Sequence, residues 1–334
     1  MPSLPLFQPP EKPSLIGIAR LASQGESLRD GHNVEYFTLP AKSLLNRCAS
    51  RRGVPFEWTI NPYRGCEFAC KYCYARYTHE FMEMRDGVDF EQKIYVKQHA
   101  AELLRQELRQ VKPGESIAIG AATDPYQPAE RRYEVTRSIL EEFARHSGFN
   151  LGIITKSNFI LRDIDVLQAV ARRNRLSVNV TITTLDVELA RILEPRAPRP
   201  DLRLEAIRKL SEAGLRVGMS GSPVLPGITD SAKDLEALVR AAAEAGAHHL
   251  FAGPLFLKPC SAAVFLPFLE KQFPHLVENY ERRYHGRAFL PDAYAKPLSQ
   301  LVTRLRRKYG IGDDPRRSET IVPRMPAGEQ LALF

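Results

Sequence analysis

Three of the five cysteines in this 334-residue chain lie within eight residues of one another and have the chemistry to bind a metal. The segment NPYRGCEFACKYCYAR carries them as Cys66, Cys70 and Cys73. Cysteine thiolates are ligands of zinc ions and of iron–sulfur clusters. The other two, Cys48 and Cys260, stand alone, and an odd number of cysteines argues against a disulfide framework. The triplet therefore predicts a metal site.

Three interpretations of the triplet are open at this point. The spacing i, i+4, i+7 fits three core cysteines on one helix face, although Pro62 and Gly65 favour a loop. A zinc site would need a fourth ligand, for which His79 is the candidate. An iron–sulfur cluster, ordinarily held by four thiolates, would keep one iron without a protein ligand. The lack of a second cysteine pair in the sequence favours the cluster over zinc.

Short apolar runs rich in β-branched residues alternate with stretches of helical period from Glu57 onward. The predicted strands are Trp58–Asn61, Ser116–Gly120, Leu151–Thr155, Ser177–Thr184, Arg216–Ser220 and His248–Leu257. Between the first two, Ala100, Leu104 and Leu108 recur at the spacing of one helix face. Strands that alternate with helices form a parallel sheet with right-handed crossovers. Six such units predict a partial, open (β/α)6 barrel, with a doubly wound open sheet as the alternative.

The pattern of strands and helices divides the chain into three predicted regions. Residues 1–55 predict an N-terminal extension with one short helix near Ala41–Cys48, and residues 56–310 predict the barrel with C-terminal helices. Residues 311–334 are typical of a flexible tail. The sequence contains no apolar run of about eighteen residues that could span a membrane. Its first residues have prolines where a signal peptide needs an apolar core, so we expect a cytoplasmic protein.

Polar residues follow the predicted strands, at the edge where barrels and open sheets bind ligands. They are Gly120, Thr123 and Asp124 after the second strand, Lys156 after the third, and Thr183 with Asn179 and Thr181 on the fourth. A lysine at a strand end in an apolar barrel needs a carboxylate partner, either a ligand or a side chain such as Asp124 or Glu194. The second-strand residues also fit a tight turn, and threonine is a good strand former in any sheet.

The cysteine motif resembles that of the radical S-adenosylmethionine (SAM) enzymes. Its Cys-x3-Cys-x2-Cys loop follows the first strand, and Tyr72 stands at the aromatic position before the third cysteine. The resemblance implies a [4Fe–4S] cluster on Cys66, Cys70 and Cys73, whose open iron binds the amino and carboxylate groups of SAM. It also implies an electron donor and cleavage of SAM to a 5′-deoxyadenosyl radical, with the cofactor supplying the difficult chemistry.

Further motifs resemble the spore photoproduct lyase-like, or DNA repair photolyase-like, subgroup. They are TDPYQPAE at Thr123–Glu130, TKSNFILRDIDVL at Thr155–Leu167, TTLDVELARILEPRAP at Thr183–Pro198 and PVLPGITD at Pro223–Asp230. The resemblance implies that Tyr72, Gly120, Thr123, Asp124, Lys156 and Thr183 bind SAM. Among these, it implies that the Thr123–Asp124 loop faces the methionyl amine and that Lys156 pairs with the SAM carboxylate. It assigns no catalytic residue.

The sequence departs from that subgroup at one position of chemical importance. Spore photoproduct lyases carry an additional cysteine on the second-strand side of the barrel, which returns a hydrogen atom to the product radical. Here no cysteine lies between Cys73 and Cys260, and Tyr126 occupies that neighbourhood. The hydrogen donor, the use of SAM or the substrate must therefore differ.

The charge balance and the last five residues both indicate which molecules the protein could bind. The chain has 47 Lys+Arg against 39 Asp+Glu, a formal charge of +8, which permits binding to a polyanion. The segment QLALF at Gln330–Phe334 resembles the peptide by which bacterial repair proteins dock on the sliding clamp. With the subgroup resemblance, these features favour DNA as the substrate. The alternatives are a radical SAM enzyme for a small molecule, tRNA or protein, and a non-catalytic zinc module associated with DNA.

Overall fold

The larger of two β-sheets is a parallel barrel wall with one antiparallel edge strand. The structure, a computed structural model, describes residues 15–31, 34–48, 55–84 and 86–312. The strand order is β11-β10-β9-β8-β7-β4-β3. These strands are β3 (Leu45–Arg47), β4 (Trp58–Ile60), β7 (Ser116–Ile119), β8 (Asn150–Thr155), β9 (Arg175–Thr181), β10 (Val217–Ser220) and β11 (His249–Phe251).

The order of the strands decides between the two predicted architectures. From β4 to β11 the six parallel strands are neighbours in chain order, and the terminal strands β3 and β11 do not pair with each other. A doubly wound sheet reverses its strand order at a switch point, and this sheet does not. The prediction of a partial, open (β/α)6 barrel is therefore confirmed.

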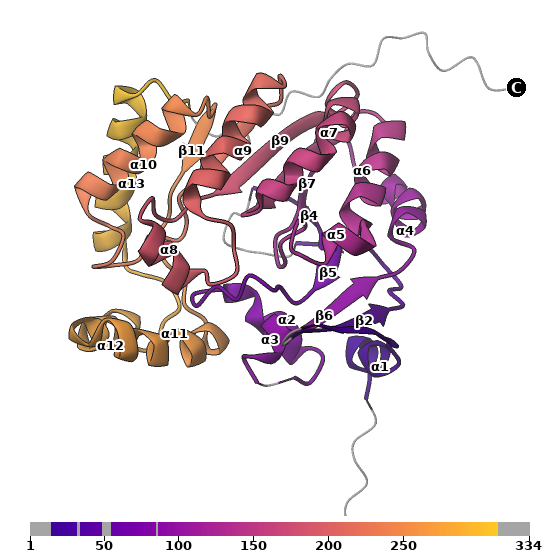
Figure 1. Ribbon diagram of the computed structural model, residues 1–334, viewed down its shortest axis with the longest axis horizontal. Coiled ribbons are helices and arrows are strands. Elements are labelled where there is room, and N and C mark those ends of the chain that lie inside the picture. The colour runs from indigo at the N-terminus through magenta and orange to yellow at the C-terminus, as the bar shows by residue number, and fades with distance from the viewer. Residues whose placement is uncertain (1–14, 32–33, 49–54, 85, 313–334) are drawn as a thin grey trace, which may run out of the picture.

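Helices cover the outer face of this sheet (Figure 1). They are α4 (Ala100–Glu107), α6 (Val135–Arg145), α7 (Ile164–Ala171), α9 (Pro200–Glu212) and α10 (Ala232–Glu244). The strands β8, β9 and β10 are buried along nearly their whole length, because each has helices on one face and the barrel interior on the other. Ile119, Ile153, Val178 and Met219 are fully buried in one core cluster with the apolar faces of these helices.

The smaller sheet joins the N-terminal segment to the loops of the barrel. Its order is β1 (Ser27–Gly31), β2 (Val34–Leu39), β6 (Lys93–Lys97) and β5 (Tyr63–Arg64), and α1 (Gly17–Ser23) packs against β2. The helix predicted near Ala41–Cys48 is wrong, because β3 pairs there with β4 in the register Leu45↔Ile60. Pairing along an open edge of the barrel satisfies the backbone and buries Leu45, which overrides the local preference.

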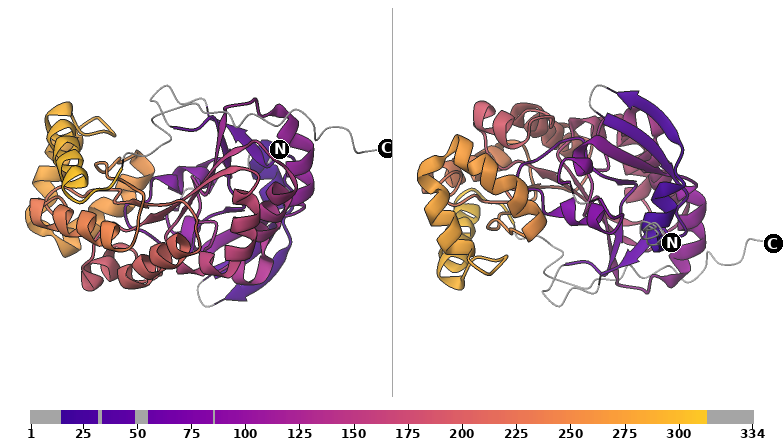
Figure 2. Two further views of the ribbon diagram at one scale, coloured as in Figure 1. Left: turned by 90° about the horizontal axis from the view of Figure 1, so that it is seen from above. Right: turned by 90° about the horizontal axis from the view of Figure 1, so that it is seen from below.

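The remaining elements are short helices in the loops and longer helices near the C-terminus. They are η1 (Tyr74–Arg76), α2 (Tyr77–Glu80), α3 (Asp89–Gln92), η2 (Leu108–Gln110), α5 (Glu130–Tyr133), η3 (Asn158–Asp163), α8 (Val187–Leu193), α11 (Pro259–Gln272), η4 (Pro274–Leu276), α12 (Val277–Tyr284) and α13 (Asp292–Lys308). Figure 2 shows the C-terminal helices gathered at the side of the molecule opposite α1. None of the described helices has the length and apolar character needed to cross a bilayer.

Candidate functional site

The cysteine loop leaves β4 and is tied to the next strand loop by its backbone. Gly65 has φ +82°, and a Cβ there would meet the carbonyl oxygen of Lys93 at 2.7 Å. The Gly65 carbonyl accepts hydrogen bonds from Thr123 Oγ1 at 2.6 Å and from Gln127 Nε2 at 3.1 Å. The Cys66 amide donates to the Phe90 carbonyl at 2.8 Å. The first cysteine is therefore held by two segments distant in sequence.

The three thiols of the loop are free, and those of Cys66 and Cys70 are buried. Burial, together with the nearby Asp124 and the other two thiols, raises the pKa of Cys66, and burial raises that of Cys70 to about 12. Thiolates in such surroundings need a metal to stabilise their charge. Within the described ranges, no three His, Cys, Asp or Glu side chains lie close enough together to hold a single metal ion. A [4Fe–4S] cluster fits this donor set, because it binds each thiolate through a separate iron.

His79, the fourth ligand of the zinc interpretation, is occupied elsewhere. Its ring lies edge-on to Phe90 and Tyr95, and Nε2 is 3.1 Å from the Lys93 carbonyl oxygen. Burial lowers the pKa of His79 to about 4. The side chain is thus a neutral part of the core beside the smaller sheet, and the expected zinc set is not assembled among the described residues.

Tyr72 lies in a buried polar network at the centre of the site. Its hydroxyl donates to Glu194, and Thr183 Oγ1 donates to the same carboxylate at 3.2 Å. Arg203 forms an ion pair with Glu194 at 2.5 Å, and both side chains are 1% exposed. Burial opposes the charge of Glu194, but Arg203 and Lys156 outweigh it, so the pKa of Glu194 is lowered. The network fixes the side chain of Tyr72, the residue directly before Cys73.

Lys156 extends from the end of β8 toward the same network. Its Nζ lies 5.6 Å from the centroid of the Tyr72 ring, and no carboxylate of the described residues is within ion-pair distance of it. Burial opposes its charge, but Cys70 and Glu194 outweigh that effect and raise the pKa of Lys156. An ammonium group without a bonded carboxylate beside the cysteine loop fits an anionic ligand group such as the carboxylate of SAM.

The predicted residues after β7 bond to the protein itself. Asp124 accepts hydrogen bonds from Thr155 Oγ1 and the Lys156 amide, both at 2.7 Å. Gly120 has φ +90°, and a Cβ there would meet the Ile154 carbonyl oxygen at 2.5 Å. These groups, like Thr123, shape the loops after β7 and β8. Their predicted contacts with SAM stay predictions.

The fourth barrel strand, β9, ends at Thr181 and not at the predicted Thr184, so Thr183 lies just beyond it. The polar residues of this region have different partners. Thr183 joins the Glu194 network, whereas Asn179 Oδ1 lies 2.8 Å from His249 Nε2 inside the sheet. The Thr181 carbonyl accepts a hydrogen bond from Arg203 at 3.1 Å. Of the three side chains, only that of Thr183 bonds to Glu194 in the network around Tyr72, whereas Thr181 contributes its backbone carbonyl.

The sequence offered Glu194 only as a possible partner of Lys156 and did not connect it with Arg203. In the sequence, Arg203 resembles the nearby Arg196 and Arg199, which are typical of exposed loop arginines. In the structure, Arg199 is indeed exposed and pairs with Asp201, whereas Arg203 is buried. The position of Arg203 in the sequence could have indicated its burial, because it falls on the apolar face of α9 with Ala206, Ile207 and Leu210. A charged residue on a buried helix face requires a partner.

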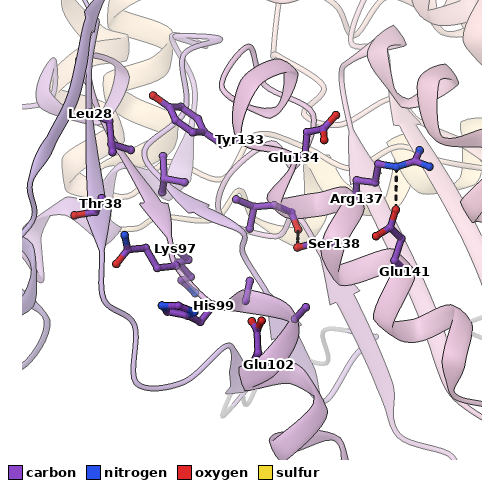
Figure 3. Close-up of a pocket in the computed structure, with 15 residues that line it drawn as sticks. Leu28, Thr38, Lys97, His99, Glu102, Tyr133, Glu134, Arg137, Ser138 and Glu141 are labelled. Carbon is purple, nitrogen blue, oxygen red and sulfur yellow. Dashed lines mark hydrogen bonds and ion pairs between the residues drawn. The ribbon is translucent and has the colours of Figure 1, made fainter.

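A cavity of about 590 Å³ lies elsewhere, between β6 and the first turns of α4 and α6. Figure 3 shows Lys97 and His99 on one wall and Tyr133, Arg137 and neighbouring residues on the other. None of the predicted site residues lines this cavity. The candidate site is therefore the cysteine loop together with the buried network around Tyr72 and Glu194.

The open parallel barrel and the three-cysteine loop at its strand ends together define a class of protein. A sequence profile described as the Radical SAM superfamily matches residues 60–242, more than half of the chain. The chain belongs to the radical SAM superfamily.

Similar proteins are known at the level of sequence and of fold. The chain is 36% identical over 306 residues to the uncharacterized protein Rv2578c of Mycobacterium tuberculosis, covering 90% of this chain and 88% of that protein. It is 29% identical over 174 residues to the uncharacterized protein MJ0683 of Methanocaldococcus jannaschii, covering 52% and 62%. A solved structure of a spore photoproduct lyase variant with bound AdoMet and dinucleoside spore photoproduct superposes with a TM-score of 0.62. That match has 16% identity and covers 82% of this chain and 79% of the other, so it shows the fold.

Proposed function

We propose that this protein is a radical SAM enzyme that binds a [4Fe–4S] cluster on Cys66, Cys70 and Cys73 and acts on DNA. The observation that carries the cofactor assignment is the arrangement at the strand ends. Three free thiols belong to one loop, and Tyr72 of that loop contacts Glu194 in a buried network. Among the described residues, no carboxylate is within ion-pair distance of the Lys156 ammonium beside Tyr72. This donor set suits the cofactors of the superfamily to which the chain belongs.

When bound, the cluster and SAM supply reductive cleavage of the sulfonium and a 5′-deoxyadenosyl radical that abstracts hydrogen. In this proposal Lys156 pairs with the carboxylate of SAM, and the Glu194–Arg203 pair holds Tyr72 in place. Thr123 and Asp124 keep the loops after β7 and β8 in position, and Gly120 permits their close packing. Buried apolar residues that pack with Cys66, Cys70 and Tyr72, among them Phe68, Leu193 and Leu225, exclude water from this region.

DNA is the proposed substrate class, on three lines of support. The motifs from Thr123 to Asp230 resemble the spore photoproduct lyase-like subgroup. The lyase of similar fold was solved with a dinucleoside spore photoproduct. The formal charge of +8 also suits a polyanion. A small molecule, a tRNA or a protein is the alternative substrate.

The cofactor proposal is tested by anaerobic purification followed by assays for iron, sulfide and 5′-deoxyadenosine. We expect about four irons per chain and formation of 5′-deoxyadenosine from SAM with a chemical reductant. Cys73→Ala should lose most of the iron, whereas the matched control Cys48→Ala should retain it. Zinc without iron or sulfide would instead support the zinc module and overturn the proposal.

The substrate proposal needs a separate measurement. SAM turnover is compared in the presence of undamaged DNA, ultraviolet-irradiated DNA and tRNA, with the cluster loaded in every sample. We expect irradiated DNA to increase turnover. Equal turnover with and without any DNA would contradict the DNA assignment and leave the cofactor assignment intact.

A further inference from the structure

An aromatic surface lies beside the cysteine loop and has no role in the network described above. It consists of Tyr74, Tyr77, Phe256 and Phe289, with Lys258 among them. Tyr74 is 39% exposed and Phe289 is 40% exposed. Large aromatic rings exposed in a group mark interaction sites on soluble proteins.

Segments far apart in the sequence build this surface. The Leu257 amide donates to the Ala288 carbonyl at 2.9 Å, which places Phe289 against Phe256. The two rings are stacked, with centroids 4.4 Å apart and an interplanar angle of 18°. Phe256 in turn lies 5.9 Å from the ring of Tyr74. The rings therefore form a column that leads from Tyr74, next to Cys73, to the exposed Phe289.

The start of α11 fixes this column to the cysteine loop. Ser261 Oγ donates to the Cys73 carbonyl at 3.1 Å. Lys258 Nζ lies 3.7 Å from the centroid of the Tyr77 ring and 5.8 Å from that of Phe256. No carboxylate of the described residues is within ion-pair distance of Lys258, whose ammonium group lies near the rings of Tyr77 and Phe256. The surface therefore combines stacking faces with one positive charge.

We propose that this aromatic surface binds single-stranded DNA, with an unpaired base stacked on Phe289 and a neighbouring phosphate contacted by Lys258. The inference rests on the proposed DNA substrate and assigns its recognition. Proteins bind unpaired bases by stacking them on aromatic rings and binding the backbone with cations. A duplex hides its base faces, so the surface selects strands whose bases are unpaired, such as those at a lesion.

The test is oligonucleotide binding by fluorescence anisotropy, with full-length, cluster-loaded protein under anaerobic conditions. A labelled single-stranded oligodeoxynucleotide is compared with the duplex of the same sequence. We expect tighter binding of the single strand, and a loss of about tenfold for Phe289→Ala. Phe289→Trp should retain the affinity, since it keeps a stacking face. Lys258→Met should reduce the slope of log K against log salt by about 0.7, the value for one phosphate contact.

Leu202→Ala is the matched control, because Leu202 is 41% exposed on α9 and takes no part in this surface. Unchanged affinity in Phe289→Ala, or equal binding of single strand and duplex, would overturn the inference. Competition by an unfolded acidic peptide but by no oligonucleotide would assign the surface to a protein partner and also overturn it. DNA-stimulated SAM turnover, assayed on the same samples, reports separately on the proposed function.

Discussion

Arg203 is the side chain on which the buried charge of the site depends. It contacts Glu194 at 2.5 Å and donates to the carbonyls of Pro198 at 2.6 Å and Thr181 at 3.1 Å. Glu194 is in turn the acceptor for Tyr72 and Thr183. Because a buried carboxylate without its cation is costly, Arg203 stabilises the position of Tyr72 without contacting it through a hydrogen bond.

The first prediction concerns this pair. Arg203→Met should lower the free energy of unfolding by about 3–5 kcal/mol, because it leaves the Glu194 charge buried and unpaired. Adding Glu194→Gln removes that charge and keeps an acceptor for Tyr72, so the double variant should recover part of the loss. Urea unfolding measures both. Arg199→Met is the control, and its exposed pair with Asp201 should be worth less than about 1 kcal/mol. A double variant less stable than Arg203→Met would contradict this account.

Lys97, at the edge of the cavity in Figure 3, predicts a pH dependence of stability. Burial, with a contribution from Arg64 that Glu107 opposes, lowers its pKa to about 7. Between pH 7 and about 10.4 the unfolded lysine holds a proton that the folded one has released, so this group makes stability rise with pH. Below pH 7 its contribution is constant.

Lys97→Met should therefore increase the free energy of unfolding most near pH 7, with the gain shrinking toward pH 10. The difference between wild type and variant should change by at most about 1.4 kcal/mol per pH unit. Urea unfolding at several pH values in this range measures it. Lys296→Met, an exposed position on α13, is the control with no expected slope. Parallel curves for wild type and Lys97→Met would refute the prediction.

At the scale of elements, the loop after β4 is held in place by neighbouring loops. The Gly65 backbone passes against the segment before β6, and its carbonyl is bonded by Thr123 and Gln127 after β7. On the other side, the Lys71 amide donates to the Leu193 carbonyl at the end of α8, and Ser261 of α11 bonds Cys73. The three cysteines are thus presented by a loop that four separate elements support.

Gly65→Ala should disturb this loop more than the fold. The positive φ costs about 1–2 kcal/mol for a residue with a Cβ, and that atom would also clash with the Phe90 and Lys93 carbonyls. We expect reduced iron content after anaerobic purification and a far-ultraviolet circular dichroism spectrum like that of wild type. Gly148→Ala, also at positive φ but in open space, is the matched control and should keep its iron. Full iron content in Gly65→Ala would show that the loop tolerates displacement.

At the scale of the whole molecule, the barrel is open between its terminal strands β3 and β11. The sheet ends at β11 without closing onto β3, and α11 brings the aromatic surface to the cysteine loop near that end. The N-terminal segment joins the smaller sheet through the β2–β6 pairing. The division into residues 1–55, 56–310 and 311–334 stays a prediction, as does the electron donor.

The sliding-clamp prediction concerns Gln330–Phe334, which lie outside the described residues. Short motifs with a glutamine and hydrophobic anchors bind shallow apolar pockets and order on binding. A pull-down with the bacterial clamp should retain the full chain and lose a variant that lacks these five residues. A variant with the same five residues in scrambled order is the control and should also be lost. Equal retention of all three would end the hypothesis.

The sequence by itself determined the cysteine triplet, five of the six barrel strands to within a few residues and the helices between them. These features are local: they follow from spacing and from the period of apolar residues along one stretch of chain. It placed the end of the last strand too late, because β11 stops at Phe251, before Gly253 and Pro254.

Only the tertiary structure decided which polar residues meet. Tyr72 and Glu194 are 122 positions apart, and Ser261 is 188 positions from Cys73. The strand β3, read as a helix from local pattern, depends on the open edge that β4 offers. Contacts of this kind are set by the order and curvature of the sheet, which no local pattern encodes. The buried pair of Glu194 and Arg203 and the aromatic surface beside Cys73 both depend on that packing.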